Sequence, residues 1–285
     1  GYTDNSYLHG CGSGQECNCL RDVYMRVLSL GAGVQSTVMA LMVEEGELPM
    51  VDCAIFADPG WEGENTYTHL DWLENQLSFK LYRVNGGNLR DDYIKSVKSG
   101  DRVASIPAFT SSGGVIMRQC TTEYKINPIR KKIKELLGVK KGKMVPKGEL
   151  VTQLLGISID EASRMKPSQD RWIHNTWPLI EKRMSRYDCI QWFNKRYPDR
   201  KLSKSSCIGC PYHSDAVWRE MKMNDPVSFA DAVEFDKNIR VTPKLDDKLY
   251  LHKSRKPLDE VDFRSLEDMG QINMFEEECS GLCGV

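Results

Sequence analysis

Residues 29–37 read SLGAGVQST, a glycine-rich turn between an apolar run and a stretch of helical character. The run from Tyr24 to Leu30 predicts a buried strand, and the stretch from Val38 to Glu45 predicts a helix that ends at Gly46. A helix that starts after such a turn offers backbone N–H groups and the positive end of its dipole to an anion. The turn therefore predicts a site for a phosphate-like group.

The chain continues this β/α alternation on both sides of the turn. Strands are predicted over residues 51–56, 81–84 and 151–157, and amphipathic helices over 65–78 and 126–136. Strands that alternate with helices indicate an α/β fold, a mostly parallel sheet flanked by helices. Ligands of such sheets bind beyond the carboxyl ends of the strands, where the glycine-rich turn and the turn after residue 58 are both expected.

Three regions are expected: an irregular N-terminal arm over residues 1–22, a nucleotide-binding α/β domain over 23–160, and a helical, cysteine-bearing C-terminal region over 161–285. Smaller expectations are a mobile loop over 105–114, mainly helical structure over 160–199, a helix that begins at Asp225-Pro226, and a partly irregular tail over 241–277.

Composition restricts the function classes. The chain has 285 residues, 40% of them hydrophobic and 28% charged, as in ordinary soluble globular proteins. A net charge of −1 gives no global bias towards nucleic acid. No stretch approaches about 18 consecutive apolar residues, so no membrane partner is expected. No secretory pattern is visible at the N-terminus, and a cytoplasmic location is expected.

Ten cysteines indicate metal binding or redox chemistry in an intracellular chain. Cys207 and Cys210 form a Cys-x-x-Cys pair, whose spacing lets both sulfurs face one metal centre. Cys53 and Cys189 lie in apolar or amphipathic runs and are predicted to be buried core residues. The arm carries three more cysteines, which belong either to a flexible segment or to a metal site: Cys11, Cys17 and Cys19.

Several types of nucleotide loop compete for the glycine-rich turn. A dinucleotide fingerprint needs a third glycine where Ser36 stands, and a Walker loop needs a lysine that is missing. The pyrophosphate loop of ATP pyrophosphatases, S-G-G-x-D-S, is matched in relaxed form by Ser29, Gly31, Gly33, Gln35 and Ser36. A simple turn that packs helix on strand is the remaining alternative.

Further motifs follow this loop in order. They are Asp58-Pro59-Gly60, Cys120 with the basic segment to Lys125, Gly156-Ile157-Ser158 with Glu161 and Arg164, and the Cys207–Cys210 pair. In this order the stretch over residues 27–212 resembles the phosphoadenosine phosphosulfate (PAPS) reductase family, iron–sulfur subgroup, within the adenine nucleotide alpha-hydrolase-like superfamily of PP-loop ATP pyrophosphatases. In that family the acidic residue of the loop is lost, as at Gln35.

The resemblance implies a set of site residues. For an adenine nucleotide or sulfonucleotide they are Ser29, Gly31, Ala32, Gly33, Gln35, Ser36, Asp58, Lys125 and Arg164. For a [4Fe-4S] cluster they are Cys120, Cys207, Cys210 and, as fourth ligand, Cys283 or Cys279. The tail also supplies the expected redox nucleophile, Cys279. A zinc site of Cys207, Cys210, Cys279 and Cys283 is the alternative for the metal.

Two enzyme classes and one non-enzymatic class remain open. The first is a sulfonucleotide reductase that uses a thiol reductant. It is favoured by Gln35, which contributes no carboxylate to a Mg²⁺ site. The second is an ATP-dependent sulfur transferase for tRNA or DNA, favoured by the Arg-, Lys- and Trp-rich residues 171–196, which otherwise form a solvated helix face. The third is a nucleotide-binding regulator without turnover.

Overall fold

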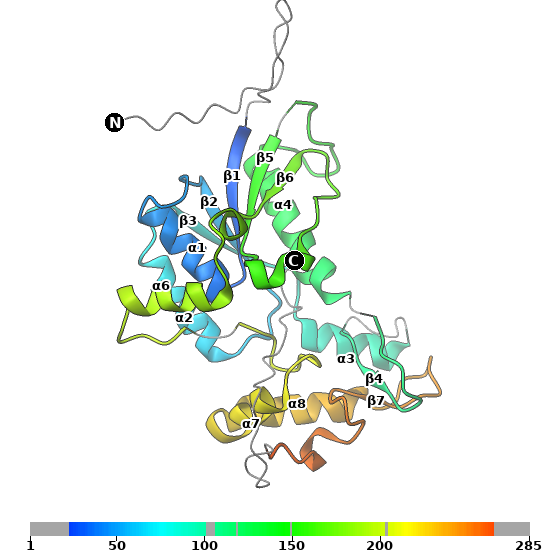
Figure 1. The fold of residues 1–285 in the computed structure, drawn as a ribbon. Coiled ribbons are helices and arrows are strands. Elements are labelled where there is room, and N and C mark those ends of the chain that lie inside the picture. Colours follow the sequence, from blue (N-terminus) through cyan, green and yellow to red (C-terminus); the bar gives the residue numbers. More distant parts are fainter. Residues whose placement is uncertain (1–22, 101–105, 118, 149, 203–204, 265–285) are drawn as a thin grey trace, which may run out of the picture.

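The structure is a computed structural model that describes residues 23–100, 106–117, 119–148, 150–202 and 205–264 (Figure 1). The first part contains β1 (Val23–Leu30), α1 (Val34–Glu44), β2 (Cys53–Asp58), α2 (Glu64–Glu74) and β3 (Lys80–Asn85). The middle part contains α3 (Leu89–Ser99), β4 (Phe109–Thr110), a π-helical turn (Thr121–Ile126) that runs into α4 (Asn127–Leu136), β5 (Leu150–Leu155), a 3-10 helix (Ile159–Arg164) and β6 (Ile173–Thr176). The last part contains α5 (Pro178–Glu181), α6 (Arg186–Arg196), α7 (Asp215–Asn224), α8 (Pro226–Ile239), β7 (Leu249–Tyr250) and a 3-10 turn (Leu258–Glu260).

Five strands form one parallel sheet in the order β3-β2-β1-β5-β6. The chain first builds outward from β1 to β3 and then returns to the other side of β1 with β5, so the direction of building reverses between β1 and β5. The expected fold class, a mostly parallel sheet flanked by helices, is confirmed. A reversal of this kind opens a crevice at the carboxyl ends of the two strands.

Both faces of the sheet are covered, which explains the continuous apolar run in β1. Leu28 and Leu30 of β1 belong to the core with α1, α2 and α6, whereas Met25 and Val27 belong to the core with α4. The predicted core cysteines lie in these layers: Cys53 is 3% exposed and Cys189 is 0% exposed, so that prediction is confirmed.

A second hydrophobic core lies beyond the carboxyl ends of the strands, in the lower part of Figure 1. The helices α3, α7 and α8 surround it together with the antiparallel pair β4 and β7. Trp61, from the turn after β2, packs on Phe235 of α8 with ring centroids 4.5 Å apart. Its Nε1 donates a hydrogen bond to Asp231 at 2.6 Å. Trp61 therefore ties the end of β2 to α8.

Two segments differ from the sequence prediction. Residues 160–199 were expected to be mainly helical, but Ile173–Thr176 form the edge strand β6, so the sheet continues past residue 160. Only Ile173 of this strand is buried, and so short a strand has no apolar alternation to reveal it. In the expected loop, Phe109 and Thr110 pair with β7 rather than remaining irregular.

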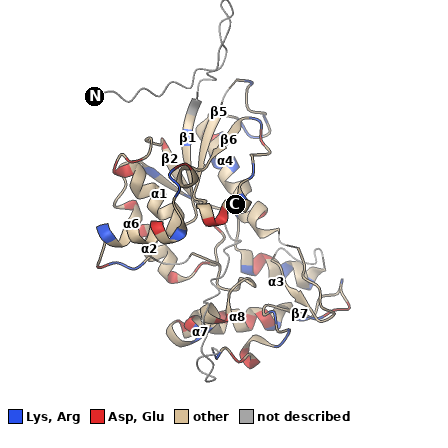
Figure 2. Cartoon of the chain, in the orientation of Figure 1, with Lys and Arg blue, Asp and Glu red and all other residues tan. Residues whose placement is uncertain are grey.

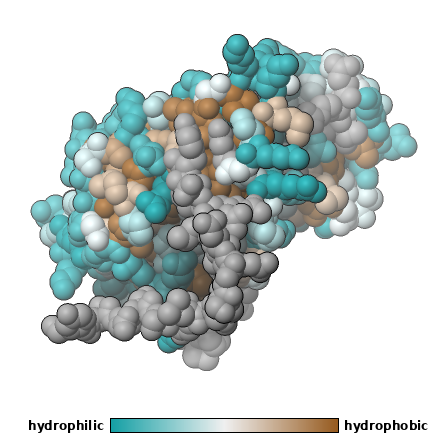
Figure 3. All heavy atoms as spheres, turned by 90° about the horizontal axis from the view of Figure 1, so that it is seen from above, coloured by the Kyte–Doolittle hydropathy of each residue, from teal (hydrophilic) through white to brown (hydrophobic). Residues whose placement is uncertain are grey.

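The predicted arm with Cys11, Cys17 and Cys19 and the tail with Cys279 and Cys283 lie outside the described residues. Charges of both signs are scattered over the outer helices (Figure 2). In the view from above, the described residues at the left edge are mainly hydrophilic (Figure 3). Among the described helices, none combines the length and the apolar character that a membrane span needs.

Candidate functional site

The turn between β1 and α1 brings backbone N–H groups to the crevice. Ala32 is fully buried in the left-handed conformation, with φ of 56°, and Gly33 caps α1 with extended backbone and no side-chain hydrogen bond. The Ser36 hydroxyl accepts a hydrogen bond from the Gly31 N–H at 3.1 Å and so closes the turn. The first turn of α1 contains no acidic residue, so its N–H groups and dipole favour an anion.

The end of β5 meets this turn from the other side of the reversal. Gly156 follows β5, and a Cβ at this position would stand 2.9 Å from the nitrogen and 3.0 Å from the Cα of Ser36. Only glycine permits so close an approach between the two backbones. The sequence therefore uses Gly156 to hold the ends of β1 and β5 together around the crevice.

A cavity of about 390 Å³ opens at this crevice. Its volume lies within the range of roughly 300–1,000 Å³ that is usual for small-molecule sites. Residues at the ends of β1, β2 and β5 line it together with residues between 205 and 217. Its apolar wall includes Leu30, Phe56, Ile129, Leu155 and Ile157. An apolar wall beside a helix N-terminus suits a heterocyclic base joined to an anionic group.

The charged lining of this cavity is mainly cationic. Five cationic side chains contribute to it: Lys125, Arg130, Arg164, Lys166 and Arg186. Among the described residues that line the cavity, Glu161 is the one acidic residue. This imbalance favours an anionic ligand, because opposite charges in a concave site reinforce one another.

Gln35 lies at the centre of a network of polar side chains on the cavity wall. Its Nε2 donates to Glu161 Oε2 at 3.1 Å and to Ser158 Oγ at 3.3 Å, and its Oε1 accepts from Arg186 Nη1 at 3.2 Å. The other Glu161 oxygen, Oε1, accepts from Arg164 Nη1 at 2.6 Å. Elements on both sides of the crevice thus meet at Gln35.

Most of the predicted nucleotide residues line this cavity, and two do not. The lining residues are Ser29, Gly31, Gly33, Gln35, Ser36, Lys125 and Arg164. Ala32 is buried under the turn. Asp58 is used locally, because its Oδ1 accepts from the Gly60 N–H at 2.7 Å and from the Tyr67 hydroxyl at 3.0 Å. Ala32 and Asp58 are therefore not placed to contact a ligand in the described cavity.

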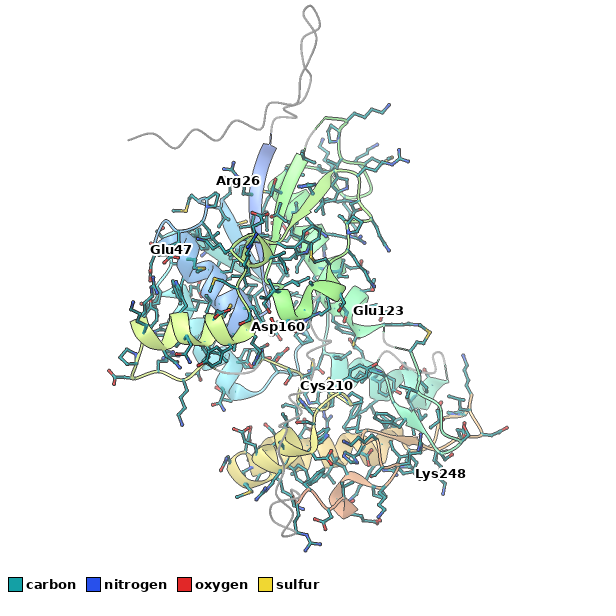
Figure 4. All side chains as sticks on the ribbon, in the orientation of Figure 1. Arg26, Glu47, Glu123, Asp160, Cys210 and Lys248 are labelled. Atoms are coloured by element: carbon teal, nitrogen blue, oxygen red, sulfur yellow. The ribbon has the colours of Figure 1, made fainter. Side chains whose placement is uncertain are left out.

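A smaller cavity of about 30 Å³ adjoins the first and is lined by the three predicted cluster cysteines that the structure describes, Cys120, Cys207 and Cys210. Lys125, Cys210 and Tyr212 line both cavities. Figure 4 shows Cys210 between the sheet and the second core. The structure thus places the cysteines next to the 390 Å³ cavity. The order of the motifs along the chain does not by itself require this proximity.

The Cys207–Cys210 loop is held by the backbone and by Trp61. The Ile208 N–H donates to the Trp61 carbonyl at 2.9 Å, and the Cys210 N–H donates to the Cys207 carbonyl at 3.1 Å. His213 donates its Nε2 proton to the same Cys207 carbonyl at 3.0 Å. Such contacts fix the loop's shape without using the thiols.

A buried carboxyl group lies behind this loop. Glu62 is 4% exposed, and its Oε1 lies 3.6 Å from Lys125 Nζ and 3.9 Å from Cys207 Sγ. Burial raises the pKa of Glu62 above its ordinary value, while Lys125 and the Ser205 hydroxyl act in the opposite direction. Glu62 therefore connects the smaller, cysteine-lined cavity (the cysteine cavity) to Lys125, a cation of the 390 Å³ cavity (the anion cavity).

The cysteine cavity has the donor chemistry of an iron–sulfur or zinc site but not a complete ligand set. Three thiols line one small space. Within the described residues, however, no three metal-ligating side chains surround a single point closely enough to hold a metal ion. The candidates for further ligands, Cys279 and Cys283, lie outside the described residues.

Comparisons with known proteins show similarity to solved structures only. No protein-family model and no curated protein sequence matches the chain. Among solved structures, the chain is similar to the phosphate complex of phosphoadenylyl-sulfate (PAPS) reductase from Candida auris, with 13% sequence identity and a TM-score of 0.38. That similarity covers 63% of this chain and 80% of the reductase chain.

Sequence reasoning missed several cavity residues. Arg130 and Lys166 stood in segments that carried no motif, and Glu161 was noted only beside Arg164. Arg186 was one of many basic residues between 171 and 196. A signal was available for Arg186, because Ser185 and Asp188 form a capping box that marks it as the first residue of a helix. The capping box predicts where the helix starts, but it does not predict that the Arg186 side chain reaches the cavity.

Proposed function

We propose that this chain is a PAPS reductase-like enzyme that binds an adenine sulfonucleotide in the 390 Å³ cavity. The observation that carries the proposal is the position of Cys210, which lines both the cationic cavity at the N-terminus of α1 and the adjoining cysteine cavity. A site for an anionic nucleotide that touches a group of thiols is suited to chemistry at a sulfur atom of the ligand.

The apolar and the cationic parts of the cavity wall would contact different parts of the ligand. The apolar side chains at the ends of β2 and β5 would contact adenine, and the N–H groups at the start of α1 would bind the phosphosulfate. Lys125 and Arg164 would contact its oxygens. Because both cations line the cavity while engaging Glu62 and Glu161, their positions are fixed before the ligand arrives.

The proposed reaction is a two-step thiol reduction. The thiolate of Cys279 attacks the sulfate sulfur, an S–S bond forms, and the bond from sulfur to the bridging phosphate oxygen breaks, so that the adenine nucleotide leaves as its 5′-phosphate. A thiol reductant then attacks the Cys279 sulfur, a disulfide forms, and sulfite leaves with the electron pair. A nearby cation would favour the thiolate of Cys279.

We further propose that Cys120, Cys207, Cys210 and Cys283 bind a [4Fe-4S] cluster, with a zinc site as the alternative metal centre. A cluster held there would supply redox chemistry near the sulfate. The residues of this chain would orient it through the backbone contacts of the Cys207–Cys210 loop and through His213.

The assay is sulfite release under anaerobic conditions, with adenosine 5′-phosphosulfate or its 3′-phosphorylated form and a dithiol reductant. We expect sulfite from one of the two, and none after Cys279→Ser. Pyrophosphate release from ATP that tRNA or DNA stimulates, without sulfite from either sulfonucleotide, would replace this proposal with the sulfur-transferase function. Binding of the nucleotide without either product would indicate a regulator.

A further inference from the structure

Arg186 reaches the anion cavity from a helix far along the chain. It is the first residue of α6, and 151 positions separate it from Gln35, whose side chain accepts its hydrogen bond at 3.2 Å. A guanidinium group carries its N–H donors in a fixed plane, so the bond to Gln35 fixes the orientation of that plane. The lining of the cavity includes both residues.

We infer that Arg186 is a ligand-binding residue of this cavity, positioned by Gln35, and that it takes the place of a divalent cation at the terminal anionic group. The ligand accordingly binds as a free anion. The inference rests on the proposed nucleotide site and specifies which residue recognises the sulfate or phosphate end.

The start of α6 holds Arg186 firmly. The Ser185 hydroxyl accepts from the Asp188 N–H at 3.1 Å, and the Asp188 carboxylate accepts from the Ser185 N–H at 2.8 Å. The Arg186 N–H itself donates to Asp160 Oδ1 at 3.0 Å. The capped helix end tied to the segment after β5 fixes the backbone of Arg186, and Gln35 orients its guanidinium. A cation held in this way binds an anion with little loss of side-chain entropy.

The residue type at position 35 suits this role. An amide has one acceptor end and one donor end. Its Oε1 accepts from Arg186 while its Nε2 donates to Glu161, so Gln35 joins a cation and a carboxylate without adding charge. A carboxylate at this position would place two negative groups side by side. Glutamine thus connects the two sides of the crevice in a way that the acidic residue of a pyrophosphate loop could not.

The carboxylate on the cavity wall is already engaged. Both oxygens of Glu161 accept hydrogen bonds, one from Arg164 at 2.6 Å and one from Gln35 at 3.1 Å. Magnesium prefers carboxylate oxygens and near-ideal octahedral geometry, so it would have to compete with these donors. The described lining of the cavity contains no other acidic side chain. Arginine is therefore the better partner for the ligand's terminal oxygens.

The test is calorimetric titration with adenosine 5′-phosphosulfate and with adenosine, each in EDTA and in Mg²⁺. We expect Arg186→Gln to weaken phosphosulfate binding by about 10- to 100-fold, the range for a charged hydrogen bond, and to leave adenosine binding unchanged. Arg183→Gln, in the same segment but outside the cavity lining, is the matched control and should bind as the wild type does. Magnesium should not strengthen wild-type binding.

A second variant and a second probe separate the possible failures. Gln35→Glu should weaken binding in EDTA and recover part of it in Mg²⁺, because a second carboxylate can ligate the metal. Phosphosulfate binding that survives Arg186→Gln unchanged, or that requires Mg²⁺ in the wild type, would overturn the inference and leave nucleotide binding intact. If no adenine compound binds but inorganic sulfate still raises the melting temperature in an Arg186-dependent way, the role of Arg186 stands and the proposed nucleotide fails. If sulfate has no such effect, both fail.

Discussion

Gly209 packs on the indole of Trp61, so closely that a Cβ on Gly209 would stand 2.0 Å from the ring carbon Cη2. The backbone joins the same two segments, because the Trp61 carbonyl accepts from the Ile208 N–H. The position of the Cys-x-x-Cys loop is thus set by an aromatic ring at the end of β2. Position 209, the second of the two residues between Cys207 and Cys210, has to be glycine for this contact to exist.

Replacing Gly209 with alanine should therefore displace the loop. We expect a loss of about 1–3 kcal/mol in the free energy of unfolding, as for other overpacked sites, measured by urea denaturation. Gly63→Ala is the control: a Cβ there meets nothing within 4 Å, and its φ of −68° suits alanine. Equal stability of the wild type and Gly209→Ala would mean that the indole is not packed on this loop.

His69 should make the fold sensitive to mild acid. Its Nε2 lies 2.9 Å from the hydroxyl of Thr37 in α1, and burial lowers the pKa of His69 from 6.5 to about 4. The unfolded chain binds the proton more readily, so stability is present above the unfolded pKa and is lost as the pH falls towards the folded pKa. We expect a loss of about 2 kcal/mol between pH 7 and pH 5. In His69→Gln this part of the pH dependence should vanish, and a variant with the wild-type profile would show that another group causes it.

Two glycines of the anion site should respond differently to substitution. A side chain at Gly33 meets nothing within 4 Å because it enters the cavity, so Gly33→Val should fold and lose nucleotide binding. Gly156→Ala collides with the backbone of Ser36 and should cost about 1–3 kcal/mol of stability. Calorimetry and denaturation together measure both effects. Wild-type affinity in Gly33→Val would place the nucleotide elsewhere.

The cysteine cavity should give the purified protein a colour. Anaerobic preparations are expected to be brown and to bleach on reduction, as iron–sulfur centres do. Cys207→Ser and Cys210→Ser should each abolish the visible absorption, whereas Cys53→Ala should keep it because Cys53 lies in the sheet core, far from solvent. A colourless protein with one zinc per chain and no iron would contradict the iron–sulfur assignment and favour the zinc alternative.

The sequence predicted those parts of the fold that depend on local patterns. The segment β1–turn–α1 was predictable because a strand buried on both faces leads into glycines and a helix. The helix α3 was not anticipated, although Leu89, Tyr93 and Val97 recur every four residues and are all buried. The strand β6 could not be recognised, since one buried residue carries no periodicity.

The sequence singled out most residues that line the candidate site on the side of the glycine-rich turn, but it did not predict the long-range contacts there. The residues of the glycine-rich turn and the cysteines could be recognised from their spacing in the sequence. The approach of Gly156 to Ser36 and the hydrogen bond from Arg186 to Gln35 depend on how the sheet reverses and where α6 packs on α1. Such contacts join residues more than a hundred positions apart, and no local pattern encodes them.

We expect the cationic cavity at the N-terminus of α1 to bind a sulfonucleotide in preference to Mg-ATP. The most direct measurement is a calorimetric competition between adenosine 5′-phosphosulfate and Mg-ATP on the anaerobically purified protein. Gln35 and the engaged Glu161 predict tighter binding of the phosphosulfate, at least about tenfold, because a metal complex loses its oxygen ligands here. Tighter binding of Mg-ATP, with the phosphosulfate unable to displace it, would contradict the account.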